Sequence, residues 1–203
     1  MKVVVASFNP DKLVELCSLL ELPGLELVSL SEFPGAVPPD ETGATLEENA
    51  LLKARAALRS TGLPAIADDT GLEVDALSGG PGVRTARFAG PAATYDENVR
   101  HLLDLLRGVE PKHRTARFRT VCAACFPDRT EVVAEGVLEG RITERPRGSE
   151  GFGYDPVFEV AGTARTLAEL EPAEKNQISH RAMAVRELRR RLSILTPGPA
   201  ASS

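Results

Sequence analysis

The stretch KVVVASFNPDKLVELCSLLEL, residues 2–22, predicts how this chain begins to fold. Its β-branched first part, residues 2–8, favours a strand. From Asn9 onward leucines recur at helical spacing, which predicts a helix with one apolar face. Asn9 can cap that helix, and Pro10 suits its first turn because no backbone N–H is needed there. A strand, a short turn and a helix in this order are typical of an α/β protein.

The rest of the chain alternates between strand-like and helix-like segments. We expect one helix capped by Thr45 and Glu48, a second capped by Thr94 and Glu97, and a final helix from about Ser179. Between the first two helices we expect a strand at 65–67 that ends at Asp68 and Asp69, an extended run at 72–77 and a loop at 78–82. After the second helix, 115–126 and 131–142 are expected to form a hairpin. These segments predict one mixed α/β domain with a mixed sheet over residues 1–195. The tail at 196–203 is predicted to be disordered.

Composition restricts the class of protein. Of the 203 residues, 42% are hydrophobic, which suits one substantial domain. The formal net charge of −5 argues against a nucleic-acid binder, which would carry a large basic face. The N-terminal apolar run is too short for a signal peptide, and no run approaches the ~20 residues of a membrane span. We therefore expect a cytoplasmic protein without nucleic-acid or membrane partners.

Two of the three cysteines, Cys122 and Cys125, form a CxxC pattern. A zinc site would need a second pair of ligands at suitable spacing, and the sequence offers none. A redox CxxC would open a helix, whereas this one lies inside a strand-like run. We expect both thiols to be reduced and to lie in the core.

Two segments combine unusual backbone with charged side chains. In SFNPDK, residues 7–12, unpaired N–H groups at a helix start can hold a phosphate, with Lys12 adding a full charge. Carboxylates gather in a second set, at Asp40 and Glu41 and at Asp68 and Asp69. Such groups hold Mg²⁺, which prefers hard oxygen ligands. The alternatives are an ordinary capped helix and two solvated acidic turns.

Two later segments add an aromatic loop and positive charge. In GFGYDP, residues 151–156, glycines beside Phe152 allow close approach of a ligand, and the ring can stack on a base. In EKNQISHR, residues 174–181, positive charge gathers near the start of the final helix, where the helix macrodipole disfavours it. Here the alternatives are a tight turn whose Phe152 and Tyr154 pack in the core, and a plain histidine of the helix-capping region at His180. Together, the four segments indicate binding and cleavage of a nucleoside polyphosphate.

The ordered motifs carry a resemblance to a known family. They are S-F-N-x-x-K (7–12), E-T-G-x-T-x-x-E-N-A-x-x-K-A (41–54), A-D-D-T-G-L-x-V-D-A-L (67–77), a G-x-P-G-V-x-T-A-R-F type segment ending at 88, G-F-G-Y-D-P-x-F (151–158) and E-K-N-x-I-S-H-R (174–181). Over about residues 2–192 the chain resembles the inosine triphosphate pyrophosphatases, the noncanonical purine nucleoside triphosphate pyrophosphatases. The resemblance implies an elongated fold with two lobes around a central cleft, a homodimer, and Mg²⁺-dependent hydrolysis of ITP, dITP and XTP to the monophosphate and pyrophosphate.

The resemblance also implies roles for residues at matching positions. Asp69 matches the proton acceptor and a metal ligand, Glu41 matches a metal-associated glutamate, and Asp68 is a further candidate ligand. Thr70 matches a substrate contact. The polyphosphate positions are Ser7, Phe8, Asn9, Pro10, Asp11, Lys12, Lys53 and Lys175. The base-recognition positions are Phe152, Gly153, Tyr154, Asp155, His180 and Arg181.

One position departs from the family pattern, and two alternative functions remain. Where the family often has Thr-Gly-Asn, this chain has Ser7-Phe8-Asn9, which places a ring where glycine gives close backbone access. The first alternative function is a pyrophosphatase for modified pyrimidine nucleotides. The second is a nucleotide-binding module without catalysis, in which the acids are only structural.

Overall fold

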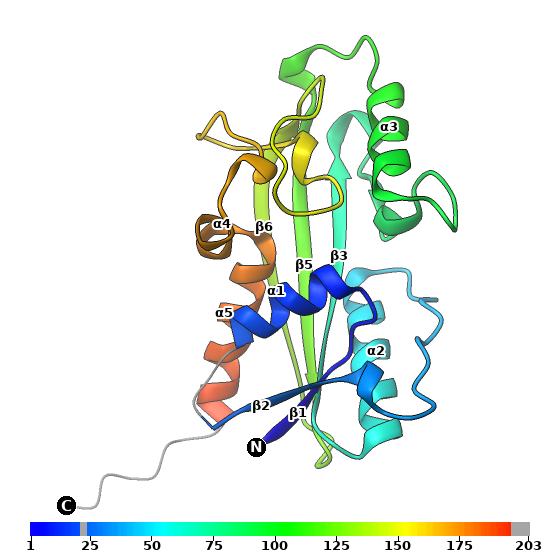
Figure 1. Ribbon diagram of the computed structural model, residues 1–203, viewed down its shortest axis with the longest axis vertical. Helices are drawn as coiled ribbons and strands as arrows, with labels where there is room; N and C mark the ends of the chain where they lie inside the picture. Colours follow the sequence, from blue (N-terminus) through cyan, green and yellow to red (C-terminus); the bar gives the residue numbers. More distant parts are fainter. Residues whose placement is uncertain (21–23, 196–203) are drawn as a thin grey trace, which may run out of the picture. The chain divides into compact units, whose positions relative to one another are not determined.

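The computed structural model describes residues 1–20 and 24–195, and the tail predicted at 196–203 lies outside this range. The chain has the predicted mixed α/β fold (Figure 1). The α-helices in the described part are α1 (Pro10–Leu20), α2 (Leu46–Thr61), α3 (Tyr95–Leu105), α4 (Pro172–Ile178) and α5 (His180–Leu195). The strands there are β1 (Lys2–Val5), β2 (Glu26–Ser29), β3 (Ala65–Val74), β4 (Gly80–Gly82), β5 (Thr115–Cys125), β6 (Glu131–Ile142) and β7 (Phe158–Val160).

The strands form one mixed sheet. They pair in the order β2-β1-β3-β5-β6-β7, and β4 pairs with β3. β1 runs parallel to both β2 and β3, because α1 and α2 provide the long crossovers that parallel neighbours require. β4 is antiparallel to β3, and β7 is antiparallel to β6.

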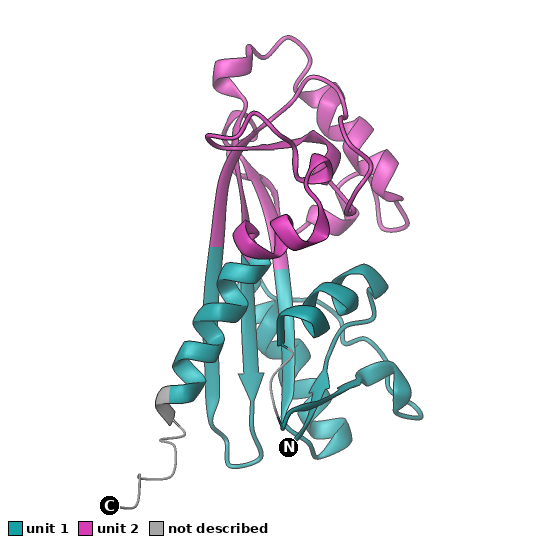
Figure 2. Ribbon diagram, turned by 60° about the vertical axis from the view of Figure 1, so that its left-hand side comes forward, with its two compact units in different colours: residues 1–69, 120–136, 181–203 teal, residues 70–119, 137–180 magenta. Residues whose placement is uncertain are grey.

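The chain divides into two compact units, which Figure 2 shows in different colours. Unit 1 contains residues 1–69, 120–136 and 181–203, and unit 2 contains residues 70–119 and 137–180. Strands β3, β5 and β6 each contribute residues to both units. The single domain over 1–195 and the elongated arrangement around a cleft stay predictions.

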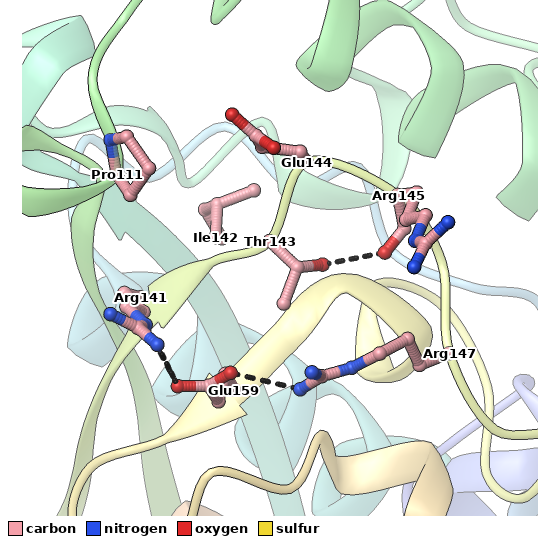
Figure 3. Close-up of a pocket in the computed structure, with 8 residues that line it drawn as sticks. All are labelled: Pro111, Arg141, Ile142, Thr143, Glu144, Arg145, Arg147 and Glu159. Atoms are coloured by element: carbon pink, nitrogen blue, oxygen red, sulfur yellow. Dashed lines mark hydrogen bonds and ion pairs between the residues drawn. The ribbon is translucent and has the colours of Figure 1, made fainter.

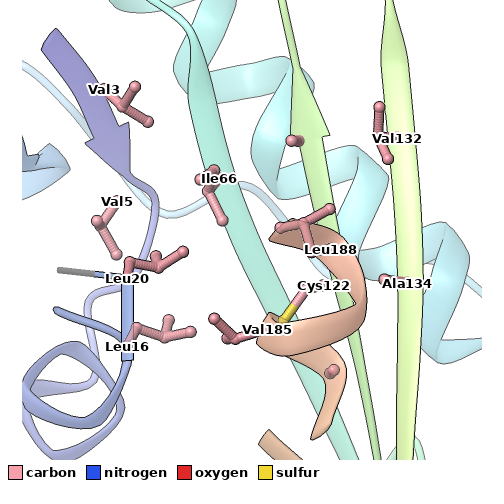
Figure 4. Close-up of a cluster of buried hydrophobic side chains, with 12 residues drawn as sticks. Val3, Val5, Leu16, Leu20, Ile66, Cys122, Val132, Ala134, Val185 and Leu188 are labelled. Atoms are coloured by element: carbon pink, nitrogen blue, oxygen red, sulfur yellow. The ribbon is translucent and has the colours of Figure 1, made fainter. Parts of the chain in front are cut away.

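In unit 1, the apolar faces of α1 and α5 pack on one face of the sheet (Figure 4). The cluster contains residues of β1, β3, β5 and β6 together with the two helices, namely Val3, Val5, Leu16, Leu20, Ile66, Cys122, Ala124, Val132, Ala134, Ala184, Val185 and Leu188. Because strand side chains alternate between faces, Ile66 and Asp68 belong to this face, and Ala67 and Asp69 belong to the opposite one.

Helix α2 lies on the Asp69 side of β3, since its side chains contact that carboxylate. Its buried stripe includes the small residues Ala50, Ala54 and Ala57. The predicted capping box begins the helix: Thr45 Oγ1 accepts from the Glu48 N–H at 3.1 Å, and Glu48 Oε2 accepts from the Thr45 N–H at 3.3 Å. Gly62 ends it in the left-handed conformation.

In unit 2, aromatic and hydroxyl groups connect the strands to the loops. The rings of Phe118 and Phe158 lie 4.7 Å apart. The Tyr154 hydroxyl donates to the Thr85 carbonyl at 3.0 Å. A second capping box, formed by Thr94 and Glu97, begins α3 as predicted.

Three local predictions were wrong. β1 ends at Val5 rather than at residue 8, because the chain then turns into the N-cap of α1. The strand predicted at 65–67 continues unbroken to Val74, so the two aspartates lie in its middle. Within the predicted loop 78–82, β4 pairs with β3. The short helix α4, which contains Lys175, was not predicted, and the final helix begins at His180, close to the expected Ser179.

The predicted CxxC interpretation is confirmed. Cys122 and Cys125 are free, buried thiols in β5. Burial raises the pKa of the Cys125 thiol to about 11, which keeps it protonated.

Across residues 1–20 and 24–195, none of the helices combines the length and the apolar character needed to span a bilayer.

Candidate active site

Asp69 lies at the centre of a polar cluster in unit 1. Lys53 Nζ donates to Asp69 Oδ1 at 2.7 Å and to Glu41 Oε1 at 3.0 Å. Asn49 Nδ2 donates to the other Asp69 oxygen, Oδ2, at 3.3 Å. Asp69 is only 6% exposed. The cluster therefore joins one strand, one helix and the loop before that helix around a buried carboxylate.

The sequence of α2 explains how its two donors reach the same carboxylate. Asn49 and Lys53 are four residues apart, so they lie on one face of the helix. The capping box fixes where the helix starts and therefore which face these side chains occupy. Glu41 comes from the loop just before this start.

Asp68 forms a second cluster in unit 1, on the opposite face of β3. Its Oδ2 accepts from both Nε and Nη2 of Arg181 at 3.2 Å, and Lys12 Nζ lies 3.4 Å away. Arg181 also forms an ion pair with Glu15 of α1. The side chains of Asp68 and Arg181 are 1% and 2% exposed. Asp68 is thus neutralised by two cations inside the core.

The turn from Ser7 to Lys12 has the geometry of a helix cap. Asn9 Oδ1 accepts from the Lys12 N–H at 3.1 Å, and the Asn9 N–H donates to Ser7 Oγ at 3.3 Å. Ser7 is buried, whereas Pro10 and Asp11 are exposed. Phe8 is 40% exposed. This turn places Lys12 at the start of α1, beside Asp68.

Burial and neighbouring charge shift the pKa values in both clusters. Burial raises the pKa of the Asp69 carboxyl above its ordinary 3.8, although Lys53 and Lys12 oppose this rise. Burial alone would lower the pKa of Lys53, but the surrounding carboxylates outweigh it and the pKa is raised. For Lys12, burial is the largest effect, and its pKa is lowered from 10.5 despite Asp68.

The GFGYDP loop forms a separate cluster in unit 2. Asp155 Oδ2 accepts from Lys175 Nζ at 2.6 Å and from the Phe152 N–H at 3.0 Å. Lys175 Nζ lies 5.0 Å from the centre of the Phe152 ring, within range of a cation–π interaction. Gly153 has a φ of +63°, which allows the turn after Phe152. The loop thus contains a half-buried ring beside a buried ion pair.

The other predicted residues of unit 2 are mostly buried. The His180 ring stacks on Phe118 with centres 4.6 Å apart. Tyr154 is 4% exposed, and burial raises its pKa above the ordinary value. Thr70 follows Asp69 in β3 and is half-buried. Lys175 belongs to unit 2, so its convergence with Lys12 and Lys53 stays a prediction.

A pocket of about 220 Å³ in unit 2 contains none of the predicted site residues (Figure 3). Glu159 lies between two arginines on its wall: Arg141 Nε donates to Oε1 at 2.8 Å, and Arg147 Nη2 donates to Oε2 at 2.9 Å. Its carboxylate is therefore already neutralised, and the candidate chemistry remains in the clusters described above.

The donor set around Asp69 suits Mg²⁺. In residues 1–20 and 24–195, no three His, Cys, Asp or Glu side chains are close enough together to hold a metal ion without other ligands. Mg²⁺ proteins commonly provide only one or two carboxylates, and substrate phosphates and water supply the rest. Glu41 and Asp69 are two carboxylates that share one cation, the Lys53 ammonium.

Sequence reasoning missed two residues of these clusters, Asn49 and Glu15. Both bond to predicted residues, Asp69 and Arg181 respectively. The position of Asn49, one turn before Lys53 and just after a capping box, was a usable signal. Glu15 had no such signal, because the apolar pattern of its helix predicts only that this acid is exposed to solvent.

Comparisons with known proteins found relatives that match nearly the whole chain. The model of the Ham1 family matches residues 3–191. A dITP/XTP pyrophosphatase from Elusimicrobium minutum is 51% identical, covering 95% of this chain and 100% of the relative. One from Methylococcus capsulatus is 52% identical, covering 97% and 98%. The solved structure of the Staphylococcus aureus Ham1 protein has a TM-score of 0.86 at 37% identity, covering 97% of this chain and all of that one.

Proposed function

The chain belongs to the Ham1 family, and from this membership we infer that it hydrolyses noncanonical purine nucleoside triphosphates to the monophosphate and pyrophosphate. Relatives that match nearly its whole length at about 50% identity are dITP/XTP pyrophosphatases. One observation carries the chemistry proposed below: Asp69 is a buried carboxylate held by a lysine that also binds Glu41.

Asp69 is the proposed general base. A water oxygen attacks the α-phosphorus, Asp69 accepts the water's proton, and the bond to the oxygen between the α- and β-phosphates breaks. Pyrophosphate then leaves with that oxygen and the bonding electron pair. Asp69 suits this role better than Asp68, because Arg181 and Lys12 already neutralise Asp68. The raised pKa of Asp69 also makes it a stronger base than an exposed aspartate.

Lys12 and Lys53 are the proposed polyphosphate ligands in unit 1. Both are partly exposed, at 19% and 13% of their side chains. Charge developing on the leaving pyrophosphate is stabilised most by cations already held in place, since little reorganisation is then needed. Ser7 to Asp11 are proposed to bind the same phosphates through the α1 N-terminus.

Glu41 and Asp69 are the proposed ligands of Mg²⁺. When bound there with nucleotide, the ion would neutralise phosphate charge and favour departure of pyrophosphate. Because the protein offers few carboxylates and Lys53 already pairs with both, we expect tight Mg²⁺ binding only together with the nucleotide.

The GFGYDP loop, His180 and Arg181 are the proposed base-recognition residues. A 6-oxo purine accepts a hydrogen bond where adenine's 6-amino group donates one. A buried group left unpaired by the wrong base costs about 1–3 kcal/mol, enough for useful selectivity against ATP. For Arg181, the geometry favours an indirect contribution, since its guanidinium pairs with Asp68 and Glu15.

We also propose a cytoplasmic homodimer that acts on free nucleotides. The proposal rests on the family resemblance. Light scattering of the purified chain would measure its mass against the 21.7 kDa of one copy.

The test is a substrate panel read by pyrophosphate release. We expect release from ITP, dITP and XTP with Mg²⁺, much less from GTP and ATP, and none with EDTA. Asp69→Asn should lower turnover by about 10²–10⁴-fold, the usual contribution of a general base. Unfolding of this variant in urea shows whether the fold is kept.

Three other outcomes would contradict this function. Preferred release from dUTP would favour the pyrimidine alternative. Binding without turnover would indicate a nucleotide-binding module. Orthophosphate as the product would show cleavage at a different bond.

A further inference from the structure

Asn49 is a buried amide that bonds to two groups from different parts of unit 1. It is fully buried, at 0% exposure. Its Oδ1 accepts from the Gly43 N–H at 2.8 Å, and its Nδ2 donates to Asp69 Oδ2 at 3.3 Å. The orientation of the amide follows from these partners. The Gly43 N–H can only donate, so it must face the oxygen, and an ionised carboxylate can only accept, so it must face the nitrogen.

Gly43 fits this arrangement because it has no side chain. A Cβ at this position would lie 2.6 Å from Asn49 Oδ1 and 2.8 Å from Glu48 Cβ. Such distances are too short for any other residue without a shift of α2 or the loop. The backbone at Gly43 therefore approaches Asn49 closely, two residues after Glu41.

Unit 2 contains a similar buried asparagine, which differs in one hydrogen-bond partner. Asn98, like Asn49, is the fourth residue of a helix that begins with a Thr-x-x-Glu capping box, and it is 2% exposed. Its Oδ1 accepts from the Ala89 N–H at 2.8 Å, but its Nδ2 donates to a backbone carbonyl, that of Ala86, at 3.1 Å. A buried asparagine that only ties a loop to a helix is thus present in the same chain. Asn49 differs because it bonds to a carboxylate.

We propose that Asn49 is a positioning residue for Asp69: its amide holds Oδ2 while Lys53 holds Oδ1, so that the carboxylate is fixed for proton transfer. The inference deepens the proposed function and rests on it, because the role of Asp69 belongs to that function. A carboxylate turns easily about its last side-chain torsion, since that torsion has broad minima. Two donors from successive turns of α2, one on each oxygen, remove this freedom.

Loss of the amide should affect the chemical step more than binding. We expect Asn49→Ala to lower kcat by about 10–100-fold, the range found when hydrogen-bond partners of site ligands are removed, with a smaller change in KM for dITP. A hydrogen bond to the ionised form lowers a carboxyl pKa. The acid limb of kcat/KM should therefore move to higher pH.

Asn49→Asp keeps the shape and an acceptor for the Gly43 N–H, but it replaces the donor to Asp69 with a negative oxygen. Repulsion from this new charge raises the pKa of Asp69 whatever the role of Asn49, so the acid limb of this variant does not separate positioning from a structural role. The kcat plateau above the acid limb does separate them. Positioning predicts a kcat loss in both Asn49 variants beyond that of the matched Asn98 variants, and a structural role predicts equal losses.

The matched controls are Asn98→Ala and Asn98→Asp, which remove the equivalent bonds in unit 2. They should change stability to a similar extent and leave the acid limb unmoved. If Asn49→Ala folds poorly, the carboxyl ¹³C shift of Asp69, followed by NMR against pH in the folded fraction of this variant, gives the acid-limb readout without turnover.

Different outcomes of these experiments would overturn the positioning role and the proposed function on which it rests. An active wild type whose Asn49→Ala variant keeps the wild-type acid limb, with kcat losses in both Asn49 variants no larger than those of the Asn98 variants, would overturn the positioning role alone. A wild type that releases no pyrophosphate from dITP would overturn the proposed function and this inference with it.

Discussion

Asp68 and Asp69 are neighbours in the chain, yet they serve separate clusters. Their side chains leave β3 on opposite faces, as consecutive residues in a strand must. Asp69 meets Lys53 and Asn49 of α2, whereas Asp68 meets Lys12 and Arg181. The pleat thus relieves the repulsion between the two carboxylates, because each charge has its own cations. It also gives the two carboxylates different proposed roles: Asp69 accepts the proton, and Asp68 stabilises the core.

The shifted pKa values predict a bell-shaped pH dependence of kcat/KM. Asp69 must be ionised to accept a proton, so activity rises as pH passes its pKa, which burial raises above 3.8. Lys12 must be protonated to bind phosphate, so activity falls as pH passes its pKa, which burial lowers below 10.5. Lys12→Arg should move the alkaline limb to higher pH, because arginine stays charged. An alkaline limb at the same pH in this variant would assign it to another group.

The pair of Asp68 with Arg181 predicts a large effect on stability. Asp68→Ala leaves a buried guanidinium with Glu15 as its remaining acidic partner among the contacts described, and breaking a buried pair in this way costs about 3–5 kcal/mol. Urea unfolding measures this loss. The double variant Asp68→Leu with Arg181→Met should recover part of it, because the apolar pair needs no charge compensation and the two charges left without these partners, Lys12 and Glu15, are partly exposed. A double variant as unstable as the sum of the single changes would contradict this account.

At the level of elements, the sequence predicted what depends on near neighbours. Both capping boxes form as expected, because Thr45 and Glu48, or Thr94 and Glu97, need only three residues of spacing. The length of β3 was underestimated, because Asp-Asp-Thr-Gly is unfavourable in a strand unless distant cations neutralise it. Those cations come from other elements, which no local pattern reveals.

The same limit applies to the candidate site. Lys53, Glu41 and Asp69 were predicted as site residues from the family motifs, and the structure brings them together in unit 1. The contact of Asn49 with Asp69 joins residues 20 positions apart, and it depends on how α2 docks on β3. Helix α4 was missed because it has only seven residues, too few for a periodic pattern.

At the scale of the whole molecule, three strands connect the two units. β3, β5 and β6 pass without a break through the boundaries after residues 69, 119 and 136. When one of these strands unfolds in one unit, its continuation in the other unit loses the adjoining part of the backbone hydrogen-bond ladder. The two units should therefore unfold in a single cooperative transition, as expected when structure is shared rather than linked by a flexible segment.

The chain contains separate natural probes for this last prediction. It has no tryptophan, its two tyrosines, Tyr95 and Tyr154, lie in unit 2, and its three cysteines lie in unit 1. Tyrosine emission in urea reports on unit 2, and the reaction of Cys122, whose thiol is fully buried, reports on unit 1. We expect the two midpoints to coincide. Thiol reaction that is complete before tyrosine emission changes would show that unit 1 unfolds first, and the continuous strands would then not be enough to couple the units.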